Sequence, residues 1–397
     1  MIPNCEKCQQ PIVQSQWDNP SVSNKLNHLA IWNTNRCDLR CAYCFVFQRE
    51  ATQPDIDIND KVIEALPAFY EKHCDLSKQV MVYFFGGEPM MAFDKVKQVY
   101  ERLKSYNILW SMTSNLTLIH EEEAAWMGER GFRVHCSIDG IEAANIARKY
   151  PNGQNSWKEA IKGLGMVRKH LTASPELRAT VTPSTVKYVY DSVMFFVEQG
   201  INFMAVEPAY ETEWSKADID DLMDQYAKVA KFMVHNRNRE FSFKPINDVK
   251  HLLDAQGRKD QPDFWKTRCG LGQTGVAVDT DGSIYGCHHF VCNHRPQEKI
   301  GDVFTGIDEV ARTGFANAMT AQRPRNATDP DKCKHCSVER NCMGGCIATN
   351  VDLFDQGYLV PDSYCDIQNA QVRSLVNYAI DLNNTMVSKV TGMKSLS

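Results

Sequence analysis

Residues 28–238 alternate between two patterns of hydrophobic residues. Residues 60–73 place Val62, Ile63, Leu66 and Phe69 on one helical face, which predicts an amphipathic helix. Residues 80–85 form a continuous hydrophobic run of strand length, typical of a strand buried on both faces. This order predicts an α/β fold in which six or seven β/α units form a full or partial TIM-type barrel. Further strands are expected over 28–34, 109–114, 133–138, 177–182 and 203–206, and further helices over 93–106, 121–130, 157–170, 189–199 and 216–235.

The pattern changes after about residue 238. Residues 254–262 are polar and predict a linker or loop, and Asp281-Gly282 between two short hydrophobic runs predicts a β-hairpin. A final helix is expected over 367–383, with a frayed tail over 387–397. The domains expected from these changes are an N-terminal segment (1–27), a barrel (28–238), a linker with a cysteine-rich domain (239–379) and a C-terminal tail (380–397).

Composition excludes several classes of protein. The chain has 397 residues, 43% of them hydrophobic and 23% charged, which is typical of a globular protein. Its net charge of −5 disfavours binding to nucleic acid. The sequence holds no run of 18 hydrophobic residues and begins without a secretory signal, so we expect a cytoplasmic protein that does not enter a membrane.

Cysteine is the unusual feature of the composition. The chain has 15 cysteines, and cytoplasmic reductants disfavour disulfides, so cysteines at short spacings indicate metal or iron–sulfur ligands. Cys37, Cys41 and Cys44 follow the first expected strand directly. Three thiolates can hold three irons of a [4Fe–4S] cluster and leave the fourth iron open. A zinc site is the alternative, but it would lack a fourth ligand.

This cysteine group, together with two motifs at strand ends, resembles the radical S-adenosylmethionine (SAM) superfamily. Gly86-Gly87-Glu88 ends the second strand and Ser137-Ile138-Asp139-Gly140 ends the fourth. The resemblance implies that the open iron binds SAM. The resemblance gives no family role to Asn115, because Thr113-Ser114-Asn115 departs from the Thr-Asn-Gly of many relatives. The residues implied to lie at the cofactor are Tyr43, Gly86, Gly87, Glu88, Ser137 and Arg148, with the Glu88 carboxylate on the amino group of SAM.

A second set of cysteines resembles the SPASM domain, a C-terminal extension of radical SAM enzymes that holds two auxiliary [4Fe–4S] clusters. The resemblance implies that the first auxiliary cluster has an open iron or takes Cys292 as a further ligand. On this region alone, zinc remains an alternative. Cys5 and Cys8 form a separate pair, and Cys74 and Cys136 are expected to be packed thiols. The implied ligands are Cys333, Cys336, Cys342 and Cys365 for the second auxiliary cluster and Cys269, Cys287 and Cys346 for the first.

The resemblance implies a maturase that uses a 5′-deoxyadenosyl radical to abstract hydrogen from a peptide side chain. We expect an oxidative crosslink, carbon–carbon or thioether, in a ribosomally made peptide. The alternatives are oxidation of a Ser or Cys side chain, as in sulfatase-maturating enzymes, a small-molecule dehydrogenase, and a non-catalytic scaffold. Sulfatase maturases carry an aspartate after the cysteine equivalent to Cys287, and a second cysteine soon after Cys269. This chain has His288 at the aspartate position and lacks that second cysteine.

His288 is therefore either a catalytic base or a structural loop histidine. The implied partners are a precursor peptide and a reducing protein such as flavodoxin or ferredoxin. Only 27 residues precede the first expected strand, which is too few for a fused peptide-recognition domain. Recognition of a leader peptide is therefore expected to use a separate leader-recognition protein or the surface of the barrel.

Overall fold

Seven parallel strands form the core of the computed structural model, which describes residues 25–46, 55–237, 239–256, 270, 272–292, 295–319, 322–339 and 342–391. Each strand pairs with the next one along the chain from β1 to β7. Within the described residues no pairing joins β7 to the opposite edge of the sheet. The predicted partial barrel is confirmed. The strands are β1 (His28–Trp32), β2 (Val80–Phe85), β3 (Ile108–Ser114), β4 (Arg133–Ser137), β5 (Glu176–Val181), β6 (Phe203–Pro208) and β7 (Ser242–Phe243).

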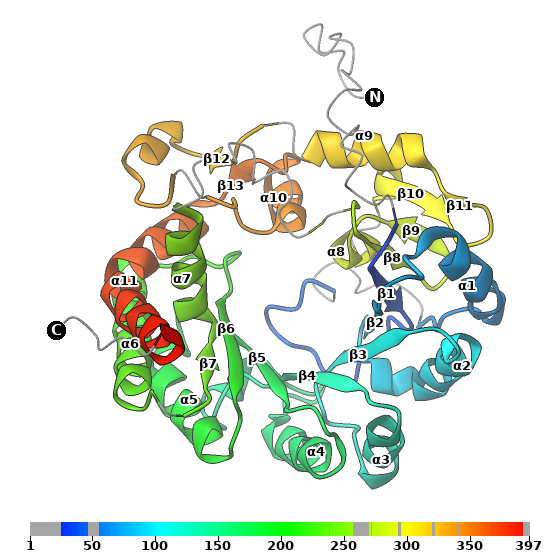
Figure 1. The fold of residues 1–397 in the computed structure, drawn as a ribbon, viewed down its shortest axis with the longest axis horizontal. Coiled ribbons are helices and arrows are strands. Elements are labelled where there is room, and N and C mark those ends of the chain that lie inside the picture. The colour runs from blue at the N-terminus through cyan, green and yellow to red at the C-terminus, as the bar shows by residue number, and fades with distance from the viewer. Residues whose placement is uncertain are drawn as a thin grey trace, which may run out of the picture.

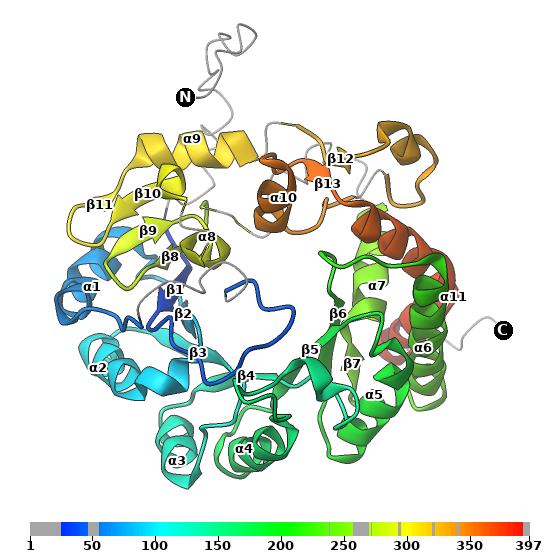
Figure 2. The ribbon, with the colours of Figure 1, turned by 180° about the vertical axis from the view of Figure 1, so that it is seen from behind.

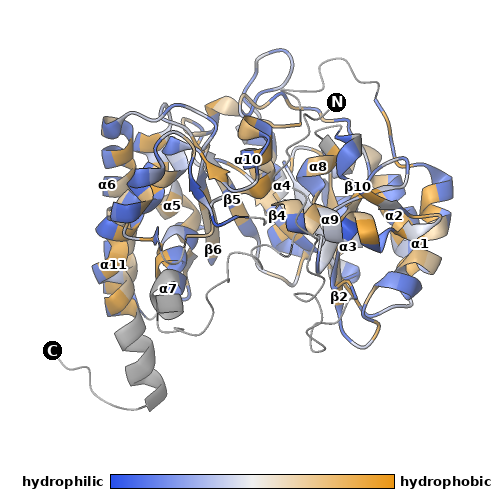
Figure 3. Ribbon diagram, turned by 90° about the horizontal axis from the view of Figure 1, so that it is seen from above, coloured by the Kyte–Doolittle hydropathy of each residue, from blue (hydrophilic) through white to orange (hydrophobic). Residues whose placement is uncertain are grey.

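Helices surround this sheet on its outer side (Figures 1 and 2). Local capping defines where several begin: Asn59 accepts a hydrogen bond from Lys61 N at 2.9 Å, and Ser215 forms a capping box with Asp218. Hydrophilic and hydrophobic residues take different sides of helices such as α6 (Figure 3). None of the described helices combines the length and hydrophobicity needed to cross a membrane. The outer helices are α1 (Asp60–His73), α2 (Phe93–Leu103), α3 (Glu121–Glu129), α4 (Trp157–His170), α5 (Val189–Glu198) and α6 (Lys216–His235).

The strands separate a buried outer face from a more polar inner face. In β5, Leu177, Ala179 and Val181 are almost fully buried. Successive side chains of a strand point to opposite faces. The alternate residues Arg178 and Thr180 therefore share the inner face of the barrel, where Arg178 is exposed.

The chain after β7 extends the same sheet and then spans the barrel. β8 (Gly275–Val278) pairs in parallel with β1, and three antiparallel strands follow as the predicted hairpin and its extension. Figure 1 shows the last third of the chain reaching from this edge back to α6. The remaining elements are β9 (Ser283–Tyr285), β10 (Lys299–Asp302), β11 (Gly306–Ile307), β12 (Arg325–Asn326), β13 (Leu359–Val360), α7 (Lys244–Gln256), α8 (His288–Cys292), α9 (Glu309–Met319), α10 (Ile347–Phe354) and α11 (Asp362–Thr391).

Two expectations for the C-terminal part were wrong. Residues 254–256 end α7 and do not belong to a loop; the rest of the expected linker lies outside the described residues. Ile246 and Val249 of α7 are fully buried. Tertiary packing therefore stabilises this helix, although the polar sequence at its C-terminal end predicted a loop. The tail that was expected to fray is helical as far as Thr391. The helix α11 extends beyond the predicted helix, residues 367–383, at both ends. The helix α11 packs beside α6 and α7.

Candidate active site

The loops that follow the first four parallel strands meet at one edge of the barrel. We call residues 37–44 the first cysteine loop; its three cysteines are half-buried. Its backbone donates hydrogen bonds from Arg40 N to Lys149 O (2.7 Å) and from Ala42 N to Ala147 O (3.0 Å). The blue chain that includes this loop crosses the interior of the ring in both ribbon views (Figures 1 and 2). The loop after β4 therefore supports the first cysteine loop along its length.

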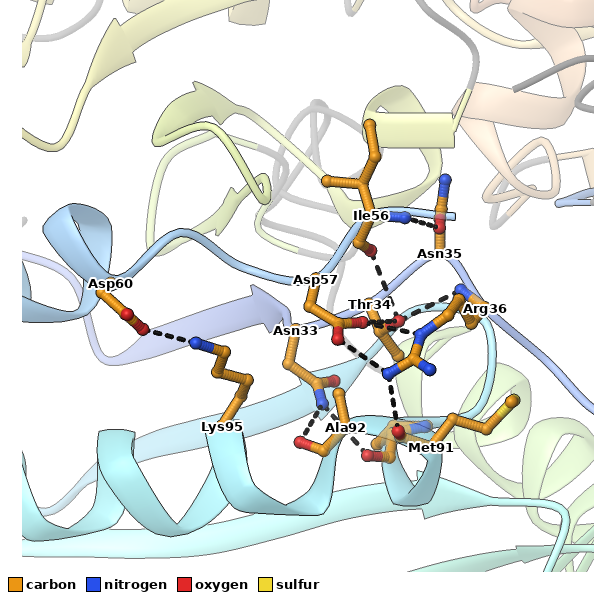
Figure 4. A network of polar contacts seen from close by, with 11 residues as sticks. Asn33, Thr34, Asn35, Arg36, Ile56, Asp57, Asp60, Met91, Ala92 and Lys95 are labelled. Carbon is orange, nitrogen blue, oxygen red and sulfur yellow. Dashed lines mark hydrogen bonds and ion pairs between the residues drawn. The ribbon is translucent and has the colours of Figure 1, made fainter. Parts of the chain in front are cut away.

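Polar side chains anchor the segment that leads into the first cysteine loop (Figure 4). Arg36 donates two hydrogen bonds to the carboxylate of Asp57 (2.7 and 2.9 Å) and one to Met91 O (2.8 Å). Asn33, which is fully buried, donates to Pro89 O at 3.1 Å. Bidentate pairs of this kind restrict geometry as well as adding energy. The chain before Cys37 is thus bound to the turn after β2, a link that sequence reasoning missed.

Gly86 and Gly87 pack directly against that same segment. Gly87 N donates to Thr34 O at 2.9 Å. A Cβ on Gly87 would lie 2.1 Å from Arg36 O, and one on Gly86 would lie 2.2 Å from Thr34 O. Any side chain would push the two segments apart, so the Gly-Gly pair is required for the close approach of two backbones. Contact of these glycines with SAM stays a prediction.

Glu88 is buried at the centre of these loops, with 1% of its surface exposed. Its carboxylate accepts hydrogen bonds from Ser114 Oγ (2.8 Å), Asn115 N (2.7 Å) and Met90 N (3.1 Å). Burial raises the pKa of Glu88 to about 7, although these hydrogen bonds oppose the rise. The Asn115 side chain also donates to Asp38 at 2.8 Å. Ser114 and Asn115, where the sequence departs from the Thr-Asn-Gly of many relatives, therefore help to hold Glu88 and the first cysteine loop together.

Tyr43 of the first cysteine loop forms a network with the buried residues Asp139 and Arg148. The Tyr43 hydroxyl donates to Asp139 Oδ2 (2.6 Å) and accepts from Arg148 Nη1 (2.7 Å), and Arg148 lies 3.7 Å from Asp139 Oδ1. Burial raises the pKa of Tyr43 well above its usual value, so the hydroxyl keeps its proton. These groups are bound to one another here, and their contact with SAM stays a prediction. Ser137 lies half-buried at the end of β4, and its contact with SAM also stays a prediction.

His288 and His289 bring α8 against the first cysteine loop. The His288 ring lies 4.5 Å from Phe85 and 6.3 Å from Tyr83, both on the inner face of β2. Burial lowers the pKa of His288 well below its usual value, so the ring is neutral. The His289 ring stacks on Phe45, next to Cys44, with centroids 4.1 Å apart. This stack places the Cys287 segment beside the loop that holds Cys37, Cys41 and Cys44.

The four cysteines expected to hold the second auxiliary cluster lie together. We call residues 322–339 and 342–365 the second cysteine region. All four of these cysteines line one cavity of about 420 Å³. Asn326 N and Gly344 N donate hydrogen bonds to the sulfurs of Cys333 (3.4 Å) and Cys342 (3.3 Å). Burial raises the pKa of Cys365 to about 12, and the neighbouring thiols oppose its ionisation further. The four are Cys333, Cys336, Cys342 and Cys365.

The expected first auxiliary cluster is described only in part. Cys287 is half-buried, whereas Cys346 is exposed just before α10. Cys269, Cys5 and Cys8 lie outside the described residues, as does the side chain of Cys292. Cys74 and Cys136 are buried in the hydrophobic core, as expected of packed thiols.

The thiols of both cysteine regions are donors that an iron–sulfur cluster can take. Among the described residues, no three His, Cys, Asp or Glu side chains converge as ligands of one ion. The cysteines of a [4Fe–4S] cluster bind separate irons, so they need not converge on one point. Thiols grouped around a space, with backbone N–H groups directed at the sulfurs, suit such a cluster.

Comparisons with known proteins agree with this geometry. Residues 34–182 match the model of the Radical SAM superfamily. An uncharacterised protein of Methanocaldococcus jannaschii is 26% identical over 186 residues, which are 46% of this chain and 62% of that protein, less than two thirds of its length. A cysteine-type anaerobic sulfatase-maturating enzyme of Clostridium perfringens is 25% identical over 340 residues, 78% of this chain and 85% of that enzyme.

Two solved structures share the fold. The structure of native anSMEcpe with bound AdoMet superposes with a TM-score of 0.73 at 20% identity, over 90% of this chain and 99% of that one. Streptococcus suis SuiB bound to its precursor peptide SuiA superposes with a TM-score of 0.58 at 19% identity, over 87% of this chain and 76% of that one. The likeness confirms the barrel with its C-terminal extension.

Proposed function

We propose that this chain, whose residues 34–182 match the model of the Radical SAM superfamily, is a radical SAM maturase that modifies a peptide. The observation that carries the proposal is the convergence of strand-end loops, in which the segment that leads into the first cysteine loop is bound to the Gly-Gly-Glu turn. The peptide class is supported by relatives named as sulfatase-maturating enzymes and by SuiB, whose structure contains a precursor peptide.

Residues at the strand ends and in α8 have chemical properties that suit this radical reaction. Cys37, Cys41 and Cys44 would hold a [4Fe–4S] cluster, and the buried Glu88 carboxylate would accept a hydrogen bond from the amino group of SAM. When bound, the cluster and SAM would together supply a 5′-deoxyadenosyl radical able to remove a hydrogen atom from the substrate. Tyr83 and Phe85 line the adjacent inner face and would exclude water. The neutral ring of His288 could accept the proton that leaves the substrate.

The modification that we favour is an oxidative crosslink in a ribosomally made peptide. Loss of one hydrogen atom to the radical and of one electron and one proton from the substrate allows a new carbon–carbon or thioether bond to form. The chain would hold three [4Fe–4S] clusters in all. The two auxiliary clusters in the C-terminal region would accept that electron. The presence of His288 in place of an aspartate favours crosslinking over oxidation of an alcohol.

A sulfatase-maturase type of oxidation is the second candidate. It is supported by the similarity to the Clostridium perfringens enzyme over most of both chains. In that reaction the same two hydrogens would leave a single Ser or Cys side chain. A reducing protein such as flavodoxin or ferredoxin would supply the first electron in either case, and a separate leader-recognition protein is proposed for the first candidate only.

The test is anaerobic turnover followed by high-resolution mass spectrometry. The reconstituted enzyme is given SAM, dithionite and a short peptide encoded beside its gene. A peptide lighter by two hydrogens, with the loss mapped to two joined residues, supports crosslinking, and a loss at one Ser or Cys supports the second candidate. Formation of 5′-deoxyadenosine with no change in any peptide contradicts both.

The matched variants are Cys41→Ala and Cys74→Ala. Cys41→Ala removes one expected ligand and is expected to reduce 5′-deoxyadenosine to background. Cys74→Ala removes a thiol that is buried in the core, far along the chain from any expected ligand, and is expected to preserve it. Continued 5′-deoxyadenosine formation by Cys41→Ala would contradict the assignment of the first cysteine loop.

A further inference from the structure

Arg178 is an exposed cation on the inner face of the barrel. It lies in the middle of β5, between the buried residues Leu177 and Ala179, so its side chain belongs to the face opposite the outer helices. In the sheet register it lies beside Ser137 on β4. Ser137 ends its strand at the site proposed for SAM. Arg178 therefore lies close to the place where the reacting part of a substrate would be held.

The carboxylates near Arg178 already have other side chains as partners. Glu176 lies 3.0 Å from His135, and Glu207 lies 2.8 Å from Lys244. Lys244 is shared further with Asp248, at 2.7 Å. Within the described part of the chain, the Arg178 guanidinium makes no hydrogen bond or ion pair, although its positive charge acts on Tyr83, His288, Glu176 and Glu207.

An arginine in this position suits the binding of an anion. A guanidinium has five N–H donors in a planar fork that matches the two oxygens of a carboxylate. Arg178 lies near enough for its charge to act on Tyr83 and His288, and the aromatic ring of Phe85 packs against His288. An anion placed here would be partly removed from water, which strengthens its attraction to the guanidinium.

We propose that Arg178 binds a carboxylate of the peptide substrate, and so selects peptides that carry an acidic residue or their C-terminus beside the modified side chain. This inference rests on the proposed function, since it takes the substrate to be a peptide. Within a peptide, the only anions at neutral pH are aspartate, glutamate and the terminal carboxylate. Arg178 thereby acts in substrate selection, and the radical chemistry is left to the strand-end loops.

The first test measures access to the Arg178 side chain in the wild-type holoenzyme. Phenylglyoxal labels exposed arginines, and mass spectrometry reports the rate at each one. The probes are acetyl-Ala-Asp-Ala-amide and its neutral counterpart acetyl-Ala-Asn-Ala-amide. We expect the aspartyl peptide to slow labelling of Arg178 by a factor of 1 + [L]/Kd, reaching more than about threefold, and the asparaginyl peptide to have little effect. Arg102 on α2, half exposed outside the barrel, is the internal control and should be labelled equally in all samples.

Each other outcome overturns the proposal. Equal protection by both peptides would mean that the carboxylate is not what is bound. Protection by inorganic phosphate and not by the aspartyl peptide would assign Arg178 to another anion. No protection would remove the site altogether. The proposed function is judged separately, by whether the same wild-type preparation forms 5′-deoxyadenosine from SAM and changes the mass of a peptide.

The second test uses the peptide that the wild-type enzyme modifies. Arg178→Gln is expected to raise KM about 10- to 100-fold with a much smaller change in kcat, as expected for loss of a charge-assisted hydrogen bond. Arg178→Lys should recover part of this loss, because it keeps the charge without the fork. Replacing the acidic residue of the peptide by its amide should raise KM for the wild type and not for Arg178→Gln. A loss in kcat that ignores peptide charge would indicate a structural role and contradict the proposal.

Discussion

The two cysteine regions differ in what holds their cysteines in place. Hydrogen bonds from Arg40 N and Ala42 N bind the first cysteine loop to the loop after β4, and its network with two buried residues supports it further. The second cysteine region consists of short elements around a cavity of about 420 Å³. Its ion pairs, such as Lys332 with Asp362, are largely exposed. The protein scaffold therefore shapes the first loop, whereas we expect the second region to depend on whatever fills its cavity.

The largest effect is expected from removing cluster ligands in the second cysteine region. In Cys333→Ala/Cys336→Ala, we expect the iron content to fall from about twelve to about eight per chain, since three [4Fe–4S] clusters become two. Because metal binding there also supplies folding free energy, limited proteolysis within residues 322–365 should become about tenfold faster or more. Mass spectrometry of the fragments and iron analysis measure both changes.

The first cysteine loop provides the matched control. Cys37→Ala/Cys41→Ala should lose the same amount of iron, yet residues 33–46 should not become a new site of cleavage, because their hydrogen bonds to neighbouring loops remain. Equal protease sensitivity in the two double variants would contradict the comparison.

The second prediction concerns the network that joins the first cysteine loop to Asp139 and Arg148. Arg148→Ala leaves Asp139 buried without its cation, which is expected to lower the free energy of unfolding by about 3–5 kcal/mol. Lys332→Ala removes one partner of a 2.5 Å pair in the second region, but both side chains are 40% exposed, so the loss should be at most about 1 kcal/mol. Urea denaturation of the two variants gives the comparison. Similar losses would show that the Arg148 network adds no more than a surface ion pair.

Some of this could be predicted from sequence because it depends on short spacings. Cys37, Cys41 and Cys44 lie close together along the chain, and Gly86-Gly87-Glu88 follows an evident strand. The position of both motifs at the C-terminal ends of barrel strands was therefore predictable. The hydrophobic periods of residues 60–73 and 157–170 likewise predicted α1 and α4 with the bounds that the structure has.

The contacts between loops could not be predicted in this way. Tyr43 and Arg148 are 105 residues apart, and the hydrogen bond between them depends on how two strand-end loops lie against each other. Asp38 and Asn115 follow different strands and carry no motif that pairs them. The inner-face position of Arg178 is a partial exception, since the alternation within β5 could have indicated it.

The smallest expected effect concerns the protonation of Glu88, which tests whether the scaffold around the first loop is ready to bind SAM. Since burial raises the pKa of Glu88 to about 7, the carboxylate is mostly protonated at pH 6 and mostly ionised at pH 8. If the ionised form receives the amino group of SAM, the affinity for SAM should rise about tenfold between these pH values, in step with the ionised fraction. Anaerobic calorimetry measures this change, and Glu88→Gln should remove the part of the pH dependence that belongs to the carboxylate.

Without SAM, the effect of pH on the folding stability has the opposite sign. A carboxyl whose pKa is raised in the folded state contributes stability below about pH 4.5 that is lost as the pH rises through 7. The unliganded wild type should therefore lose stability relative to Glu88→Gln between pH 5 and pH 8. Parallel pH profiles for the two proteins, in both SAM affinity and stability, would show that Glu88 only supports the loops and does not receive SAM.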